Sequence, residues 1–183
     1  GGNRQGNFVI VVRDQAMKDM LGEAARPAGK LYTAQNKAGE SPWNTIHATK
    51  VTPEVEAATD VPLHLTDPAK KAPVLLVFCV DLQVVASTDK NLDRVGVISG
   101  GSIYPFVWNV LLAARNEGYG GTITTLAVAQ EPKLQQALNI PPHVAVAAIV
   151  PLGKPRKQLT KLRRRPVGDI VRLERFDGAP FKG

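Results

Sequence analysis

The chain has 183 residues, 44% hydrophobic and 21% charged, a composition that fits one globular domain with a real core and excludes a disordered or collagen-like chain. Its apolar runs are far shorter than the ~20 residues of a membrane-spanning helix, so we expect no membrane insertion. The single cysteine, Cys79, excludes an internal disulfide framework and predicts a reducing, cytoplasmic location. A formal net charge of +7 leaves an anionic ligand or a nucleic acid open as partners.

The first half of the chain alternates between clear and unclear patterns. Residues 7–14, "NFVIVVRD", form an apolar β-branched run that predicts a strand buried on both faces. Residues 15–25 have apolar positions at helical spacing. Residues 27–72 show little periodicity, although 28–38 can hold some helix. We expect the proline-containing stretch 40–71 to be a variable excursion or lid, since long irregular segments in compact domains are usually functional or mobile.

The middle of the chain contains the strongest predicted strand and the longest predicted helix. The strand is the continuous apolar run at 72–81, "APVLLVFCVD". The helix follows because apolar residues recur every three or four positions, at Ile103, Phe106, Val107, Val110, Leu111 and Ala114, with Trp108, Leu112 and Ala113 on its other sides. We therefore expect a central helix, ended by Gly118 and Gly120.

The last third predicts three more elements and a basic tail. Residues 121–126, "GTITTL", alternate like a strand, 130–138 form a short helix, and 143–153 form another strand. Residues 154–165, "KPRKQLTKLRRR", carry seven positive charges and no acid, at the start of a basic C-terminal tail, 154–183. The fold class is mixed α/β or α+β, a single domain over 1–183 in which helices wrap a sheet.

Several kinds of catalytic site lack candidate residues. His47, His64 and His143 do not have metal-ligand spacing, and one cysteine cannot form a pair. Cys79 lies in an apolar run, which favours a buried, inert thiol. The glycines of "GYGG" follow a helix, so they do not form a dinucleotide fingerprint. We predict no catalytic side chain, and an enzyme of this sequence would take its chemistry from a cofactor.

Three short segments could build such a cofactor site. Gly2, Asn3 and Gln5 offer a close backbone approach and two amides, and the segment from Gly121 to Thr125 offers backbone N–H groups beside small side chains. Arginines of "KLRRRP" can grip a phosphate with forked hydrogen bonds. Each also has a purely structural explanation: a turn before a strand, a helix stop before an edge strand, and a solvated basic tail.

Taken in order, the three segments resemble the flavin-dependent nitroreductase-like oxidoreductases. "GGNRQGNFVIVV" is similar to that family's Ser-Gly-Gly-Asn-x-Gln-Pro-Trp segment and first core strand. "GSIYPFVWNVLLAARNEGYGGTITTL" resembles its central helix and flavin-stacking segment. "HVAVAAIVPLGKPRKQLTKLRRRPVGDIV" resembles its closing strand and Arg-x-Pro tail. The resemblance covers about two thirds of the chain.

The resemblance implies a mostly antiparallel sheet and an obligate homodimer with FMN at the subunit interface. Such enzymes pass hydride from NADH or NADPH through the flavin to a nitro compound, a quinone or a similar small-molecule acceptor. An amide near Thr124 or Thr125 would contact the reactive ring nitrogen, and Arg164 would hold the phosphate with help from Arg163 or Arg165. The implied cofactor-binding residues are Gly2, Asn3, Gln5, Gly121, Thr122, Ile123, Thr124, Thr125, Arg163, Arg164 and Arg165.

Two departures from the family pattern affect the flavin site. The family's Pro-Trp is replaced by Gly6 and Asn7. The family's opening Arg-x-Ser/Thr-x-Arg segment, which binds phosphate, ribityl chain and pyrimidine, is missing from this sequence. We expect residues that precede Gly1 in the full protein to complete the site.

Two other functions stay open at this point. The first is a catalytically weak flavin-binding or storage protein of the same fold. The second is a nucleic-acid-binding module that uses the basic tail. Aromatic residues make up only 5% of the chain and form no stacking pattern, which argues against single-strand binding.

Overall fold

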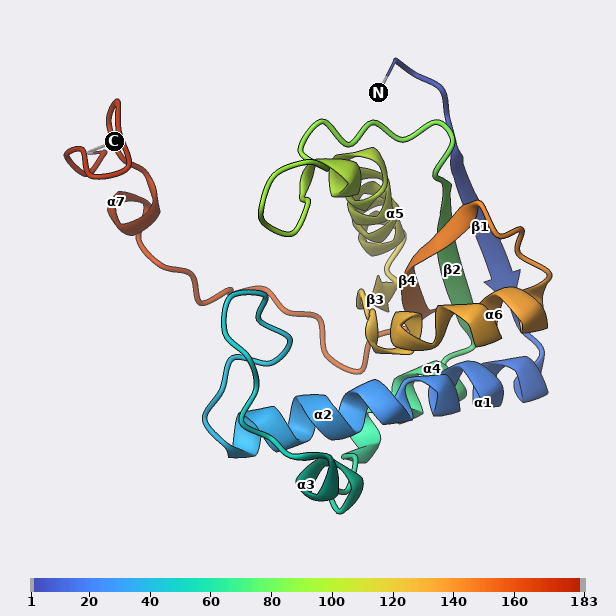
Figure 1. The fold of residues 1–183 in the computed structure, drawn as a ribbon. Coiled ribbons are helices and arrows are strands. Elements are labelled where there is room, and N and C mark those ends of the chain that lie inside the picture. Colours follow the sequence, from blue (N-terminus) through green and yellow to red (C-terminus); the bar gives the residue numbers. More distant parts are fainter. Residues whose placement is uncertain (1, 182–183) are drawn as a thin grey trace.

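The computed structural model of the chain describes residues 2–181, folded as a four-stranded sheet with helices on both faces (Figure 1). The strands are β1 (Asn7–Val12), β2 (Val74–Asp81), β3 (Gly120–Gly121) and β4 (Val144–Gly153). The helices are α1 (Gln15–Ala24), α2 (Arg26–Lys37), α3 (Pro53–Ala57), α4 (Asp67–Lys71), α5 (Tyr104–Asn116), α6 (Glu131–Leu138) and α7 (Val167–Ile170). Within residues 2–181, no helix has the length and apolar character needed to cross a membrane.

The sheet has the order β1-β2-β4-β3, and all neighbouring strands are antiparallel. This confirms the expected mostly antiparallel sheet with wrapping helices. β2 and β4 lie at the centre, where both faces are covered, and this explains why each is a continuous apolar run.

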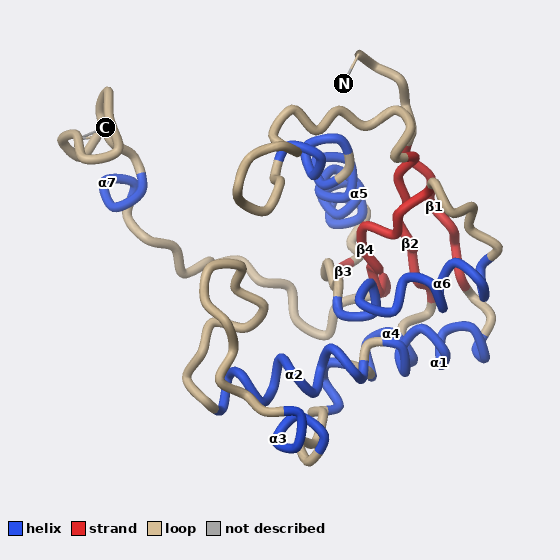
Figure 2. Tube along the Cα trace, viewed as in Figure 1, coloured by secondary structure: helices blue, strands red, loops and turns tan. Residues whose placement is uncertain are grey.

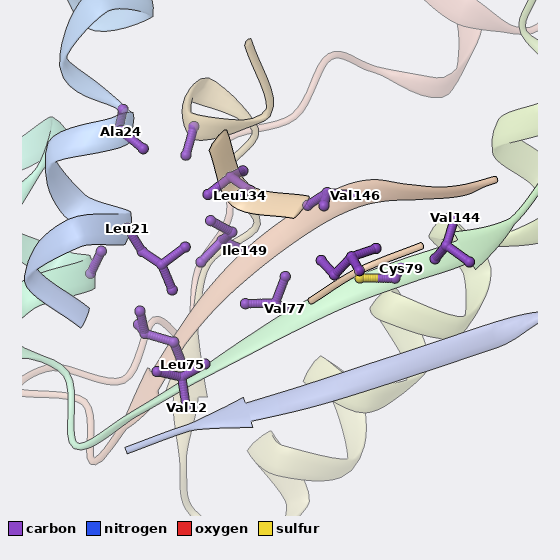
Figure 3. Close-up of a cluster of buried hydrophobic side chains, with 14 residues drawn as sticks. Val12, Leu21, Ala24, Leu75, Val77, Cys79, Leu134, Val144, Val146 and Ile149 are labelled. Carbon is purple, nitrogen blue, oxygen red and sulfur yellow. The ribbon is translucent and has the colours of Figure 1, made fainter. Parts of the chain in front are cut away.

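The two faces of β2 contribute to two separate cores. Leu75, Val77 and Cys79 point to one face and pack against α1 and α6, as the close-up of this core shows (Figure 3). Phe78 and Val80 point to the other face and pack against α5. Burial raises the pKa of the Cys79 thiol to about 11, so this buried cysteine is protonated and unreactive.

β1 forms at the predicted place but not with the predicted burial. It is an edge strand, and the side chains of Phe8, Val9 and Val11 are exposed. The expectation of burial on both faces is wrong, because α5 packs over the central strands and leaves the strand at the edge uncovered. Nothing in the local sequence distinguishes this apolar run from a central strand.

The stretch 40–71 is more ordered than its sequence pattern indicates. It contains α3, α4 and the short 3₁₀ helix η1 (Leu63–Leu65). Pro53 and Pro68 each lie in the first turn of a helix, where the missing N–H costs nothing. These segments are helical because prolines that look like breakers begin helices here, and the role of 40–71 as a variable excursion or lid stays a prediction.

Helix α5 buries one side and leaves the other open. Val107 is fully buried against the sheet, whereas Trp108 is 56% exposed and Leu112 is 49% exposed. The expected central helix is covered on one side only within this chain. Near its start, the Tyr104 hydroxyl donates to the carbonyl oxygen of Ala147 at 3.1 Å. Ala147 is the extra residue of a β-bulge in β4, so this bond ties the start of α5 to the irregular part of the strand.

The connection from β2 to α5 is ordered by one buried carboxylate. Asp89, whose side chain is 5% exposed, accepts hydrogen bonds from the backbone N–H of Val97 at 2.7 Å and from Arg94 Nη1 at 2.8 Å. These bonds hold the pKa of Asp89 at about 2, below its ordinary value of 3.8. The Asp89 carboxylate thus holds together the loop between β2 and α5, which is tan at the top of Figure 2.

We expect this loop to open in acid. Because the folded-state pKa of Asp89 is lowered, its contribution is fully present above the ordinary value of 3.8 and is lost as pH falls toward about 2. Asp89→Asn, which cannot accept the same set of charge-assisted bonds, should open the loop already at pH ~7. The NMR chemical shift of the Val97 amide measures loop opening, both in acid and in Asp89→Asn, because this N–H donates to Asp89.

The control is Asp93→Asn, which removes an exposed acid from the same loop. An unchanged Val97 shift in Asp89→Asn would contradict the prediction.

Candidate functional site

Three glycines, Gly118, Gly120 and Gly121, determine the path of the chain after α5. Gly118 has φ +78°, which ends the helix in the left-handed conformation that glycine adopts without strain. Gly120 and Gly121 then form β3 and pair with Gly153 and Leu152 of β4. The chain is thereby returned to the sheet directly after the helix.

Gly120 and Gly121 are needed for close packing. A Cβ atom on Gly121 would lie 2.8 Å from the Pro151 carbonyl oxygen and 3.0 Å from Leu111 Cδ2, and one on Gly120 would lie 3.1 Å from Pro155 Cβ. The segment therefore runs between α5 and β4 at a distance that excludes any side chain. The sequence analysis expected these glycines to let a ligand approach the backbone. Within this chain they let the backbone pack closely against Pro151, Leu111 and Pro155 instead.

The predicted strand at 121–126 is only partly formed. After Gly121 one isolated bridge joins Thr124 to Ile149, with N–H to O distances of 2.9 Å in both directions, and the chain then enters the 3₁₀ helix η3 (Leu126–Gln130). The alternation of Thr and Ile predicts a longer strand than the structure has. At the edge of the sheet, β4 is the one partner available, and the turn into η3 ends the pairing.

A pocket of about 210 Å³ lies beside this segment, on the α1 side of the sheet. Thr122, Ile123 and Thr124 form one wall, Leu21 and Ala25 of α1 form another, and β4 supplies Ile149 and Pro151. The remaining wall comes from the turn at η1 and the start of α4, including His64, Leu65 and Pro68. The lining is mostly apolar, and His64 is its one ionisable residue.

The backbone donors around the pocket are not equally free. The Thr124 N–H donates to Ile149, so it is unavailable to a ligand. The Thr125 N–H has no acceptor among residues 2–181, while the Thr125 carbonyl accepts from the Val128 N–H at 2.9 Å. Two backbone amides, those of Thr124 and Thr125, were predicted to contact the ligand, and within residues 2–181 only the Thr125 N–H is free to do so.

The predicted amide side chains lie at the other end of the sheet. Asn7 pairs with Val80, and Val80 pairs with Ala145, whereas Gly121 pairs with Leu152. Thr124 pairs with Ile149, so the segment lies between four and seven residues from Ala145, or roughly 13 to 20 Å along a strand, and Gln5 and Asn3 lie farther away than Asn7. Gly2, Asn3 and Gln5 precede Asn7, so in one chain they cannot reach the Gly121–Thr125 segment.

The N-terminal segment has an unusual backbone. Gly2, Asn3 and Gln5 all have positive φ, near +60°, and the Gln5 side-chain amide donates to Asn3 Oδ1 at 3.3 Å. Left-handed conformations are uncommon for residues with long side chains and cluster at functional sites. Both amide side chains are exposed, so they can meet a second molecule.

The predicted arginines lie on a tail that leaves the body of the protein (Figure 1). Arg115 Nη2, at the end of α5, donates to the Leu159 carbonyl at 3.0 Å and holds the start of the tail. Arg163, Arg164 and Arg165 are exposed, do not line the pocket, and within residues 2–181 form no ion pair with a carboxylate. One chain thus presents the predicted site residues in three separate places.

Sequence reasoning missed the wall at η1 and α4. His64, Leu65 and Pro68 fall in the stretch without periodicity and belong to no motif. A weak signal was present: Pro62 and Pro68 flank "LHLTD", and proline is favoured in the first turn of a helix, where Pro68 lies in α4.

Comparisons with known proteins agree with the fold. The model of the Nitroreductase family matches residues 1–154. NfrA1 from B. megaterium superimposes with a TM-score of 0.64 at 15% identity, covering 96% of this chain and 60% of that one. The NADPH:FMN oxidoreductase from Vibrio harveyi, solved with NAD⁺, gives 0.60 at 19% identity and covers 96% and 62%. An iodotyrosine deiodinase bound to FMN and 3-iodo-L-tyrosine gives 0.63 at 19% identity and covers 96% and 80%.

The family model shows which family the chain belongs to, whereas the superpositions show only its fold. A comparison with curated proteins returned no match. The chain spans about three fifths of the length of the bacterial structures named above, and at these identities the superpositions show a shared fold. The family match is independent of them and extends over 154 of the 183 residues, through β1, α5, the glycine segment and β4. The chain belongs to the nitroreductase family.

Proposed function

We propose that this protein is an FMN-dependent oxidoreductase that passes hydride from NADH or NADPH to a nitro, quinone or similar acceptor. The observation that carries the proposal is the pocket walled by Thr122, Ile123 and Thr124. Thr125, the next residue, does not line the pocket, and its N–H has no acceptor among residues 2–181. Family membership supports it, as do two neighbours of the same fold whose names include FMN.

The residues present fit part of an FMN molecule. A flat ring needs small apolar walls, and the pocket offers them. A backbone donor would have to come from Thr125 at its margin, whose N–H has no acceptor among residues 2–181. A volume of about 210 Å³ is below the ~300–1,000 Å³ of usual ligand sites. The rest of the cofactor must therefore bind elsewhere, and the phosphate suits the guanidinium groups of Arg163, Arg164 and Arg165.

Bound flavin would supply the hydride chemistry, which no side chain of this protein needs to provide. The protein residues would fix the geometry. The Thr125 N–H would hydrogen-bond the reactive edge of the ring, and the short side chains of Thr122 and Thr124 would leave its face accessible to nicotinamide and acceptor in turn. The apolar walls from α1 and β4 would exclude water from one side.

A second copy of the chain would complete the site. Asn3 and Gln5 lie roughly 20 Å along the sheet from the glycine segment, so they can contact the same flavin only from another subunit. The chain also exposes apolar side chains on α5 and on β1, which are Tyr104, Trp108, Leu112, Phe8, Val9 and Val11. Apolar faces of this extent are typical of subunit interfaces.

The absorption spectrum of the purified full-length protein tests this function. The protein should be yellow and should bleach when NADH or NADPH is added without oxygen. Colourless protein that FMN cannot reconstitute would overturn the proposal. Tight FMN binding with negligible NAD(P)H oxidation would instead identify a flavin-storage protein.

Replacing Arg163, Arg164 and Arg165 together by alanine should raise the Kd for FMN by about tenfold or more, since hydrogen bonds to charged groups contribute ~1.5–3 kcal/mol each. Fluorescence quenching of FMN measures the change. The matched control replaces Lys154, Arg156 and Lys157, which removes the same charge from the same tail. Equal losses in both variants would show that the arginines act only through net charge.

A further inference from the structure

His64 is the one ionisable side chain that lines the pocket proposed for the flavin. It shares this lining with Thr122, Ile123 and Thr124, the other lining residues are apolar, and His64 is also exposed to solvent. A histidine in this position can deliver a proton to the pocket and recover one from water.

The backbone that carries His64 is firmly held. The Leu65 N–H donates to the Pro62 carbonyl at 3.0 Å, and the Thr66 N–H donates to the Leu63 carbonyl at 3.1 Å. Thr66 is fully buried, so the turn is fixed on the side away from the pocket. Val61 and Leu65 pack onto Gly29 of α2, where a Cβ atom would lie 2.9 Å from Val61 Cγ1. A proton donor must be positioned, and this turn does so.

The charged groups around η1 do not compete for this role. On α4, Lys71 pairs with Asp67, and Lys70 pairs with Glu23 of α1. On α2, Arg26 pairs with the same Glu23, and Lys30 Nζ donates to the Ala57 carbonyl at 2.7 Å. None of these side chains lines the pocket.

We propose that His64 donates the proton that completes reduction of the acceptor, an inference that rests on the proposed function. The hydride that originates from NAD(P)H brings two electrons and one hydrogen to a quinone. A carbonyl oxygen of the quinone then carries a negative charge, and it takes a proton from the His64 imidazolium to give the hydroquinone. The neutral imidazole is protonated again by solvent. The acceptor class is therefore one that needs a proton together with two electrons.

The test compares two acceptors in His64→Gln. Reduction of a naphthoquinone should slow by about 100-fold, as expected for loss of a general acid, whereas reduction of ferricyanide, which takes up electrons without protons, should stay within about twofold. His47→Gln, an exposed histidine outside the pocket, is the control.

A binding measurement tests the position of His64 without turnover. Addition of FMN to the oxidised protein should move the NMR signal of the His64 ring and leave that of His47 in place. A yellow His64→Gln protein with an unchanged naphthoquinone-to-ferricyanide ratio, or a His64 signal that FMN does not move, would overturn the inference alone. Wild-type protein that binds no FMN would instead overturn the proposed function.

Discussion

Replacing Gly121 by alanine should destabilise the protein by about 1–3 kcal/mol, the usual cost of forcing one more group into a packed site. The added Cβ atom would lie 2.8 Å from a backbone carbonyl oxygen, that of Pro151, and 3.0 Å from Leu111 Cδ2. A flexible side chain can move aside, but Pro151 belongs to the central strand β4, whose backbone is paired with β2. Urea denaturation, read as the shift in the free energy of unfolding, measures the loss.

The same substitution should also weaken flavin binding. β3 can relieve the clash only by moving away from β4, and this movement displaces the adjacent Thr122–Thr125 segment. The matched control is Gly101→Ala, because a Cβ atom at Gly101 meets nothing within 4 Å and its φ is not positive. Gly101→Ala should be neutral or slightly stabilising through the unfolded state. Equal stability of the two variants would contradict the packing role of Gly121.

The positions of β1, β2, β4, α1, α5 and α6 were predictable from the sequence, whereas the burial of β1 and α5 was not. β2 and β4 lie between α1 and α6 on one side and α5 on the other, so every position of their runs is under the same apolar constraint. β1 has an equally apolar run, but its side chains face open surface in one chain. The proposed homodimer would cover these side chains. The same holds for α5, whose apolar outer side led to the prediction of a central helix.

The parts of the site show a similar division. The local conformation at Gly118 follows from helix-stop chemistry, and the approach at Gly121 follows from the absence of a side chain. The position of His64 opposite Thr122–Thr124 does not, since it depends on how η1 and α4 pack across α1. A contact between segments some 60 residues apart produces no repeating pattern of apolar residues in either segment, so the sequence of each gives no sign of it. The three candidate cofactor segments could be found in the sequence, and the family resemblance assigned flavin to them, but only the structure showed that one chain keeps them apart.

Replacing Trp108 by aspartate should dissociate the proposed homodimer and release its flavin. Tyr104, Trp108 and Leu112 follow one another at four-residue steps and form an exposed apolar side of α5. Truncating a tryptophan at the centre of an interface costs 2 kcal/mol or more, and a buried unpaired carboxylate adds to this, so we expect the dimer to weaken by about 100-fold or more. Sedimentation velocity shows whether the protein is a monomer or a dimer, and absorbance shows how much flavin the protein retains.

The two readouts should change together, because Asn3 and Gln5 of one copy are proposed to contact the flavin held by the other. The control is Val55→Asp, which places the same charge at an exposed apolar residue of α3, far from α5 (Figure 1). Val55→Asp should leave a yellow dimer. Since Trp108 is 56% exposed and belongs to neither core cluster, the far-ultraviolet circular dichroism of the monomeric variant should match the wild type. A yellow, dimeric Trp108→Asp protein would show that this side of α5 is not the interface, and a colourless dimer would show that the flavin site needs more than the second copy.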